Sequence, residues 1–198
     1  DNIMYNSRGN LPKNIFFLTC DALGVLPPIS KLNKEQTMYH FISGYTAKIA
    51  STETGITEPQ AIYSACFGSP FLPLHPALYT PMLGEKIEDS IEKANGDANI
   101  GLINTGWTGW SYGVGGRIEL SFTRAMIKVI LEGYLNKVVY QKHTAFGIEI
   151  PKSCPDVPNA ILNQRDTSRN EANYDATCEK LEQLFKKNFE KFSNKAGV

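Results

Sequence analysis

The residues best suited to ligand chemistry lie in one glycine- and aromatic-rich stretch, residues 106–116 (GWTGWSYGVGG). Five glycines in eleven residues exclude a regular helix or strand. Glycines let a backbone approach a ligand closely and point several N–H groups at it, so Gly113, Gly115 and Gly116 are candidates for a binding loop. The stretch is not a Walker A motif, and Ile118 occupies the third glycine position of G-x-G-x-x-G. A tight loop without a ligand remains an equal alternative.

Two polar side chains that could contact a ligand follow this stretch. Arg117 could stack its guanidinium plane on a base or hold a phosphate, and Thr123 could donate its hydroxyl. A surface arginine at the start of a strand and a helix-capping threonine are the commoner interpretations. If the segment is a strand, Arg117 and Ile118 face opposite sides, so both reach one flat ligand only if one uses backbone atoms.

Other residue types with potential chemistry lack suitable neighbours in the sequence. His40, His75 and His143 have no metal-site spacing, and His143 falls in a polar linker. Cys66 has no histidine nearby and no nucleophile elbow, so we expect a small buried hydrophobic residue there. We therefore assign no metal ligand and no catalytic residue to this chain.

Two apolar runs are expected to form the strands that position the loop. Residues 14–20 (NIFFLTC) form a short continuous apolar run, which predicts a strand buried on both faces. Residues 100–105 (IGLINT) predict a second buried strand that leads into the glycine-rich stretch. We expect the side chains of residues 15–18 and 102–103 to lie in the core. Shorter strands are expected at residues 61–67, 117–120, 138–140 and 146–150.

Four helices are expected between and after these strands. Asn33 is a candidate N-cap for a helix over residues 34–50, whose apolar residues share one face. A second helix is expected over residues 78–95, interrupted early by Pro81 and followed by Gly96 at its C′ position. A third covers residues 123–131, and a long amphipathic helix covers about 170–192. Strands that alternate with helices predict an α/β fold, with a mixed β-sheet flanked by helices.

The net charge and composition of the chain argue against some classes of function. The chain has 198 residues, about one domain's worth, with 20 Lys and Arg against 20 Asp and Glu. Zero net charge argues against a basic nucleic-acid arm or a polybasic membrane patch, so we expect no nucleic-acid and no membrane partner. The polar first residues lack a signal-peptide pattern, and four widely spaced cysteines form no C-x-x-C pair. We expect reduced thiols and a cytoplasmic location.

Longer motifs resemble one enzyme family. Residues 17–28 (FLTCDALGVLPP) resemble the FLTxDAFGVLPP stretch of the ATP-dependent phosphoenolpyruvate carboxykinases. Five further segments resemble the same family and occur in the same order. They are residues 39–48 (YHFISGYTAK), 55–59 (GITEP), 64–68 (SACFG), 104–107 (NTGW) and 112–118 (YGVGGRI). The resemblance runs from about residue 14 to residue 192.

The resemblance implies a fold, a reaction and site residues. It implies that residues 1–198 are the C-terminal mononucleotide-binding domain of a larger enzyme that converts oxaloacetate and ATP to phosphoenolpyruvate, ADP and carbon dioxide in gluconeogenesis. Arg117 and Ile118 would then flank ATP and Thr123 would contact it, with Gly113, Gly115 and Gly116 in the nucleotide loop. The phosphate-binding loop, the Mn²⁺ ligands, the Mg²⁺ site of the nucleotide and the substrate arginines would belong to an N-terminal portion. This chain alone would then be incomplete and inactive.

The sequence departs from the family pattern at two positions of the loop. The family usually reads GWxGGPYGxGKR, whereas Trp110 stands here at a glycine and Gly116 at the lysine. Losing a cation beside a polyphosphate weakens attraction, and a large indole changes the path of a tight loop. A non-catalytic, truncated or degenerate nucleotide-binding module is therefore the alternative interpretation.

Overall fold

A five-stranded mixed sheet forms the centre of the molecule. The structure, a computed structural model, describes residues 12–48, 60–64, 71–93 and 98–193. The sheet has the order β1-β5-β2-β9-β8, in which β1 and β5 are parallel and the other neighbours antiparallel. This arrangement confirms the α/β class with a mixed sheet. The strands are β1 (Asn14–Thr19), β2 (Ile29–Lys31), β5 (Asn99–Asn104), β8 (Tyr140–Lys142) and β9 (Glu149–Pro151).

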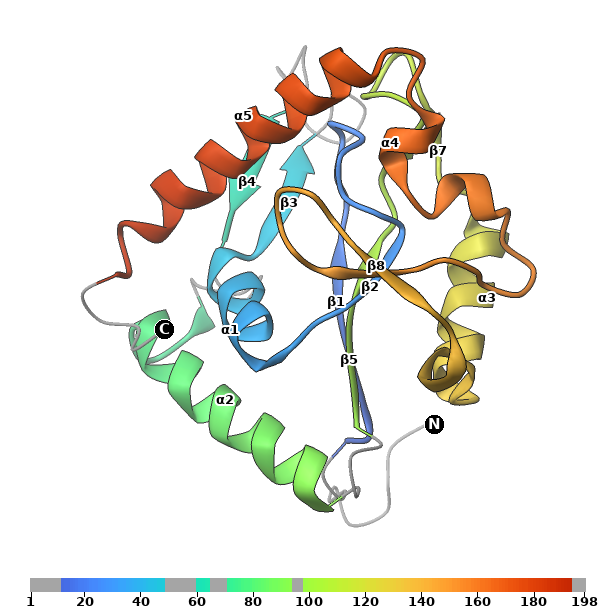
Figure 1. Cartoon of the computed structure of the whole chain (residues 1–198). Coiled ribbons are helices and arrows are strands. Elements are labelled where there is room, and N and C mark those ends of the chain that lie inside the picture. The colour runs from blue at the N-terminus through green and yellow to red at the C-terminus, as the bar shows by residue number, and fades with distance from the viewer. Residues whose placement is uncertain (1–11, 49–59, 65–70, 94–97, 194–198) are drawn as a thin grey trace.

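Helices flank this sheet on both sides (Figure 1). One side carries α1 (Lys34–Ser43), α2 (Pro76–Lys93) and α5 (Glu171–Phe189), and the other carries α3 (Leu120–Leu131). Within the described residues, no helix is both long and apolar enough to cross a membrane. The smaller elements are the ladders β3 (Tyr45–Lys48) with β4 (Gln60–Tyr63) and β6 (Trp107–Thr108) with β7 (Gly116–Arg117), the short helix α4 (Gln164–Thr167), and the 3₁₀ turns η3 (Tyr134–Lys137) and η4 (Asn159–Ile161).

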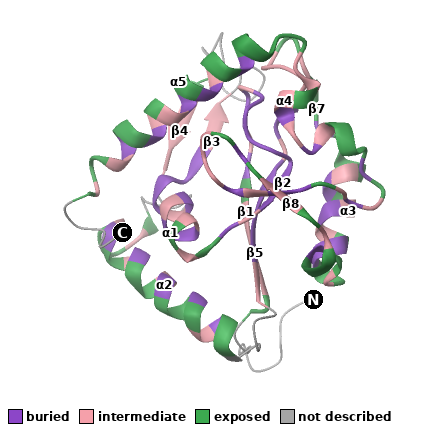
Figure 2. Ribbon diagram, viewed as in Figure 1, coloured by how far each residue is buried: buried purple, intermediate pink, exposed green. Residues whose placement is uncertain are grey.

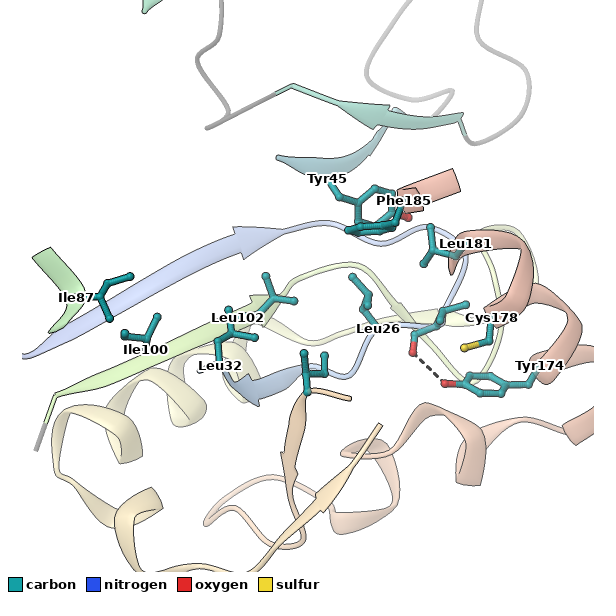
Figure 3. Close-up of a cluster of buried hydrophobic side chains, with 12 residues drawn as sticks. Leu26, Leu32, Tyr45, Ile87, Ile100, Leu102, Tyr174, Cys178, Leu181 and Phe185 are labelled. Atoms are coloured by element: carbon teal, nitrogen blue, oxygen red, sulfur yellow. Dashed lines mark hydrogen bonds between the residues drawn. The ribbon is translucent and has the colours of Figure 1, made fainter. Parts of the chain in front are cut away.

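The alternation of side chains along β5 divides the core into two layers. Ile100 and Leu102 point to the α5 side, where they join a cluster that includes Leu181 and Phe185 (Figure 3). Ile103 points to the opposite side, into a cluster with residues of α3. Figure 2 shows that the helix faces toward these layers are buried (purple) and that the faces toward solvent are exposed (green). The predicted core position of residues 102–103 is therefore confirmed, with exposed fractions of 2% and 0%.

The first helix begins as expected and ends earlier. Asn33 accepts a hydrogen bond from the N–H of Gln36, whose side chain accepts from the N–H of Asn33 in return, which is a capping box. The helix ends at Ser43 because Gly44 adopts a left-handed conformation. The expectation of a helix to residue 50 is therefore wrong, since β3 begins at Tyr45.

The prediction that residues 14–20 form a strand buried on both faces is also wrong. Among the described strands β1 pairs only with β5, so it is an outer strand. Residues 15–17 are half-buried, and Leu18 is 57% exposed. Apolar composition alone could not show this, because burial of a strand depends on how many strands lie beside it.

The remaining expected elements exist, several of them with shifted ends, whereas residues 65–67 of the expected 61–67 strand and 94–95 of the expected 78–95 helix lie outside the described residues. The tail helix spans Glu171–Phe189 rather than 170–192, and α2 continues through Pro81. The helix after the glycine-rich stretch begins at Leu120, so Arg117 is the one residue of the expected 117–120 strand that lies in β7. Cys20, Cys154 and Cys178 are free thiols, whereas Cys66 and Gly96 lie outside the described residues.

A buried carboxylate organises the segment that follows β1. Asp21 is fully buried, and its Oδ2 accepts from the N–H groups of Val25 and Leu26 at 2.7 and 2.8 Å. Its Oδ1 accepts from the N–H of Leu23 at 2.9 Å and from the hydroxyl of Tyr45 at 2.7 Å. This side chain therefore ties the 22–26 loop to β3. The donors of Val25, Leu26 and Tyr45 are buried and would otherwise be unpaired, and the N–H of Leu23 is partly buried.

We expect Asp21→Asn to lower the free energy of unfolding by about 2–4 kcal/mol, measured by urea denaturation. An amide NH₂ in place of either oxygen would face a donor that now binds it. Asp166→Asn is the matched control, because Asp166 is exposed and should change stability by less than about 0.5 kcal/mol. Equal stabilities of the two variants would contradict the structural role of Asp21.

Candidate functional site

The glycine-rich stretch folds into a small hairpin at the carboxyl ends of β1 and β5. β6 and β7 pair antiparallel, with Trp107 opposite Arg117 and Thr108 opposite Gly116. The N–H of Trp107 donates to the carbonyl of Asp21, and the N–H of Tyr112 donates to the carbonyl of Ala22. The hairpin is thus fastened to the turn that Asp21 organises. Ligands of α/β proteins commonly bind at this end of parallel strands.

Close contact between backbones explains why glycine occupies several positions in and next to the hairpin. A Cβ on Gly106 would lie 2.1 Å from the carbonyl oxygen of Asp21, and one on Gly24 would lie 2.5 Å from that of Trp110. A Cβ on Gly115 would lie 2.3 Å from the same Trp110 oxygen. These positions therefore require glycine for close contact between backbones. Close approach to a ligand is not needed to explain them.

Two loop glycines remain open. Gly113 has φ +86°, and neither Gly113 nor Gly116 has an atom within 4 Å of a Cβ built on it. Gly116, in contrast, does not have a positive φ. Both residues are exposed. The space for a side chain at Gly116, where the family pattern has lysine, is therefore present.

Arg117 is exposed and lies over an aromatic ring. Its guanidinium carbon is 5.4 Å from the centre of the Trp107 ring, and its Nε donates to the carbonyl of Thr105 at 3.3 Å. Trp107 is buried and contacts Tyr112 edge-on at 5.2 Å. The guanidinium is therefore held by a cation–π contact and a hydrogen bond, at the surface of the hairpin.

Ile118 and Thr123 have buried side chains. Ile118 joins the core cluster on the α3 side, and its N–H donates to the carbonyl of Gly106. The Thr123 hydroxyl donates to the carbonyl of Glu119 at 3.4 Å, one turn earlier in the chain. Arg117 and Ile118 thus point to opposite sides, as their alternation predicts. Of the three expected ATP contacts, the structure exposes the polar side chain of Arg117 alone.

Trp110, in the segment that joins β6 to β7, lies near the C-terminal helices. It lines a cavity of about 40 Å³ together with residues of α4 and α5, among them Gln164 and Tyr174. Gln164 is 1% exposed; its Oε1 accepts from the N–H of Gly109 at 3.4 Å. Trp110 therefore borders this cavity, and none of its atoms lies within 4 Å of a Cβ built on Gly113 or Gly116.

The sequence did not predict that the polar side chain of His143 is buried. His143 is 4% exposed rather than part of a polar linker, and its Nε2 lies 3.1 Å from the hydroxyl of Tyr174 and 3.3 Å from the carbonyl of Val25. The Tyr174 hydroxyl also donates to that carbonyl (Figure 3). Burial lowers the pKa of His143, so the ring is neutral. The only signal in the sequence was the apolar segment that follows this histidine.

Arg117 interacts electrostatically with the thiol of Cys20, the residue that follows β1. Burial raises the pKa of the Cys20 thiol, and the positive charge of Arg117 offsets part of that rise. The net effect favours the protonated thiol, which is the less reactive form. Within the described ranges, no group of three or more His, Cys, Asp or Glu residues could hold a metal ion.

We expect Gly115→Ala to destabilise the chain by about 1–3 kcal/mol, because its Cβ would overlap the Trp110 backbone. Gly116→Ala is the matched control and should leave stability unchanged. Thermal melting of the two variants tests this pair. If both variants melt at the temperature of the parent chain, close packing does not explain Gly115.

Comparison with known proteins places the chain in a family. The phosphoenolpyruvate carboxykinase family model matches residues 1–160. A relative from Flavobacterium johnsoniae named phosphoenolpyruvate carboxykinase (ATP) is 55% identical over 198 residues, which is 100% of this chain and 36% of the relative. Relatives of the same name from Christiangramia forsetii and Caldanaerobacter subterraneus are 53% and 54% identical over 100% and 93% of this chain, and 36% and 34% of their own lengths. The chain thus spans about a third of these relatives, and it belongs to the ATP-dependent phosphoenolpyruvate carboxykinase family.

Proposed function

We propose that this chain is the C-terminal, nucleotide-binding portion of an ATP-dependent phosphoenolpyruvate carboxykinase. The whole enzyme, a carboxy-lyase of gluconeogenesis in the cytoplasm, converts oxaloacetate and ATP to phosphoenolpyruvate, ADP and carbon dioxide. The observation that carries this proposal is the 55% identity to the Flavobacterium johnsoniae relative over all 198 residues. The exposed arginine on a glycine-rich hairpin, at the carboxyl ends of two parallel strands, supports it.

Arg117 supplies the adenine side of the ATP site in this proposal. Trp107 covers one side of the guanidinium, and the residue remains exposed, so a base can stack on its outer side. Gly113 and Gly116 leave open space beside it for the rest of the nucleotide. Ile118 contributes backbone atoms, since its side chain is in the core. Thr123 contacts the nucleotide only if its hydroxyl gives up the bond to Glu119.

The metal sites and the phosphate-binding loop belong to the N-terminal portion in this proposal. The described residues offer no cluster that fits Mg²⁺ or Mn²⁺, so no reaction step is assigned to a metal in this chain. The substrate arginines are assigned to the same portion. This chain then binds and orients the base, while the chemistry at the phosphates and at oxaloacetate takes place on the other portion.

A non-catalytic nucleotide-binding module is the second candidate. Gly116 favours it, because the loop lacks a cation at the position where the family pattern has lysine. Trp110 does not favour it, because this residue borders the cavity beside α4 and α5 and has no atom within 4 Å of a Cβ built on Gly113 or Gly116. The two candidates differ in whether the chain supports turnover when joined to an N-terminal portion.

We expect the 198-residue chain alone to form no phosphoenolpyruvate in a coupled assay. We expect a chimera to form it, in which this chain replaces the matching segment of the Flavobacterium johnsoniae relative. The reason is that transition-state charge in phosphoryl transfer is stabilised by metal ions and a phosphate cradle. Turnover by the chain alone would contradict the division of roles, and a folded chimera that binds ATP without turnover would support the second candidate.

We expect Arg117→Ala in the chimera to weaken ATP binding about 2- to 30-fold, the equivalent of one cation–π contact. Oxaloacetate binding should change less, because its carboxylates lie on the other portion. Arg117→Lys is the control that keeps the charge without the planar group, and it should fall between parent and alanine variant. Calorimetric titration measures both ligands; equal losses for the two would indicate an arginine with a structural role.

A further inference from the structure

We propose that Gln164 positions the hairpin that carries Arg117, and that an ordered water molecule in the neighbouring cavity binds the Nε2 of this side chain. Gln164 is the first residue of α4, and it contacts the hairpin at Gly109. The inference rests on the proposed function, because a fixed hairpin matters for ATP only if Arg117 belongs to the ATP site. It adds a residue outside the hairpin on which that site depends.

The side-chain amide of Gln164 is buried, and one of its two polar atoms has no partner. The residue is 1% exposed, and its Oε1 accepts from the N–H of Gly109 at 3.4 Å and from the hydroxyl of Thr167 at 3.5 Å. The reverse orientation of the amide would place its NH₂ against the N–H of Gly109, so that N–H selects the observed one. Nε2 is then left without a hydrogen-bond partner among the described residues. A buried donor is rarely unpaired in a native protein.

The cavity that Gln164 lines suits water better than a larger ligand. Its volume is about 40 Å³, and it lies between residues 109–111 of the hairpin and residues of α5. A water molecule needs about 10–15 Å³ of such a cavity, whereas pockets for drug-sized ligands hold about 300–1,000 Å³. The polar side chains of Ser111, Asn173 and Thr177 are part of the lining. A water molecule bound to Nε2 therefore has both the space and the further polar neighbours that buried waters require.

α4 is held against α5, so it can serve as the fixed side of the contact. The guanidinium of Arg165 donates to both carboxylate oxygens of Asp175, at 2.9 and 3.0 Å, and lies 2.8 Å from a carboxylate oxygen of Glu171. Both acidic residues belong to α5. Bidentate bonds of this kind fix the relative orientation of the two partners as well as their distance. Gln164, the neighbour of Arg165 in α4, is therefore carried on an element with a defined place.

The hairpin is attached to the fold on two sides. The N–H groups of Trp107 and Tyr112 donate to the turn that follows β1, and the N–H of Gly109 donates to Gln164. Of the described residues in α4 and α5, Gln164 is the one whose side chain is hydrogen-bonded to the hairpin. The Gly109 bond is long, so an amide that is fixed at both polar atoms holds the hairpin better than this bond alone. Because β7 contains Arg117, the place of the guanidinium depends on this second attachment.

A high-resolution crystal structure of the chain tests the water directly. We expect density for a water molecule inside the cavity, about 2.7–3.2 Å from the Nε2 of Gln164. A cavity without ordered water would overturn the proposal, and so would a protein oxygen bonded to Nε2.

Hydrogen exchange of the Gly109 amide tests the positioning role in solution. Gln164→Met has a similar length and neither polar atom, so we expect exchange about 3- to 10-fold faster than in the parent chain. Gln164→Glu keeps an oxygen for Gly109, and water can donate to its other oxygen, so exchange should stay within about twofold of the parent. Gln183→Met is the matched control, because Gln183 is exposed on α5 and should leave the exchange unchanged.

Two exchange results would overturn the proposal. The first is equal exchange of Gly109 in the parent and in Gln164→Met, which would mean that the side chain does not hold the hairpin. The second is equally fast exchange in Gln164→Glu and Gln164→Met, because a water partner, unlike a protein carbonyl, can donate as well as accept. The melting temperature of each variant is recorded beside the exchange rates, so that a loss of folding is recognised.

Ligand binding to the chimera connects this contact with the proposed function. We expect Gln164→Met to weaken ATP binding about 2- to 10-fold, the equivalent of one hydrogen bond, and Gln183→Met to leave it unchanged. Oxaloacetate binding should stay at the parent value in both, which separates a displaced hairpin from a general loss of structure. Parent affinity for ATP in Gln164→Met would overturn the dependence of the site on this residue. A parent chimera that binds no ATP, although the water and the slow Gly109 exchange are present, would contradict the proposed function alone.

Discussion

The buried carboxylate of Asp21 is the constraint on which the candidate site depends. It holds three backbone N–H groups and the Tyr45 hydroxyl, and its own N–H donates to Asn104 at the end of β5. Asn104 in turn donates to the carbonyl of Leu26 and accepts from the N–H of Gly106. The carboxyl ends of β1 and β5, the loop between β1 and β2, and the start of the glycine hairpin are thus one hydrogen-bonded unit. A buried charge is tolerated here because donors surround it.

This unit explains why the hairpin can present Arg117 in a defined place. Gly106 and Gly24 allow the hairpin backbone to lie directly on the Asp21 turn, where any side chain would overlap a carbonyl. Trp107 follows at once, buried against Tyr112, and the guanidinium lies over its ring. The aromatic and glycine residues therefore have complementary roles: the glycines bring backbones together, and the indole supports the cation. Preorganisation of this kind reduces the entropy lost when a ligand binds.

The two faces of the sheet differ in how completely they are covered. The α5 side is closed by aromatic packing around Phe185, and by the Tyr174–His143 pair, which satisfies the carbonyl of Val25. Burial raises the pKa of Tyr174 and lowers that of His143, so both stay neutral in this layer. The α3 side covers Ile103 and stops short of Leu18. The described residues therefore cover the sheet more completely on the α5 side than on the α3 side.

Local chemistry was enough to predict several features from the sequence. The Asn33 cap, the buried β5, the amphipathic face of α5 and the opposite directions of Arg117 and Ile118 all follow from spacing within a few residues. The family followed from long ordered motifs. Tertiary structure alone decided that β1 is an outer strand, that Gly115 packs on Trp110 and that His143 is buried. Each of these features depends on which segments, distant in the sequence, pack against the residue in the folded chain. The sequence pattern gives the type of each residue but does not identify these tertiary neighbours.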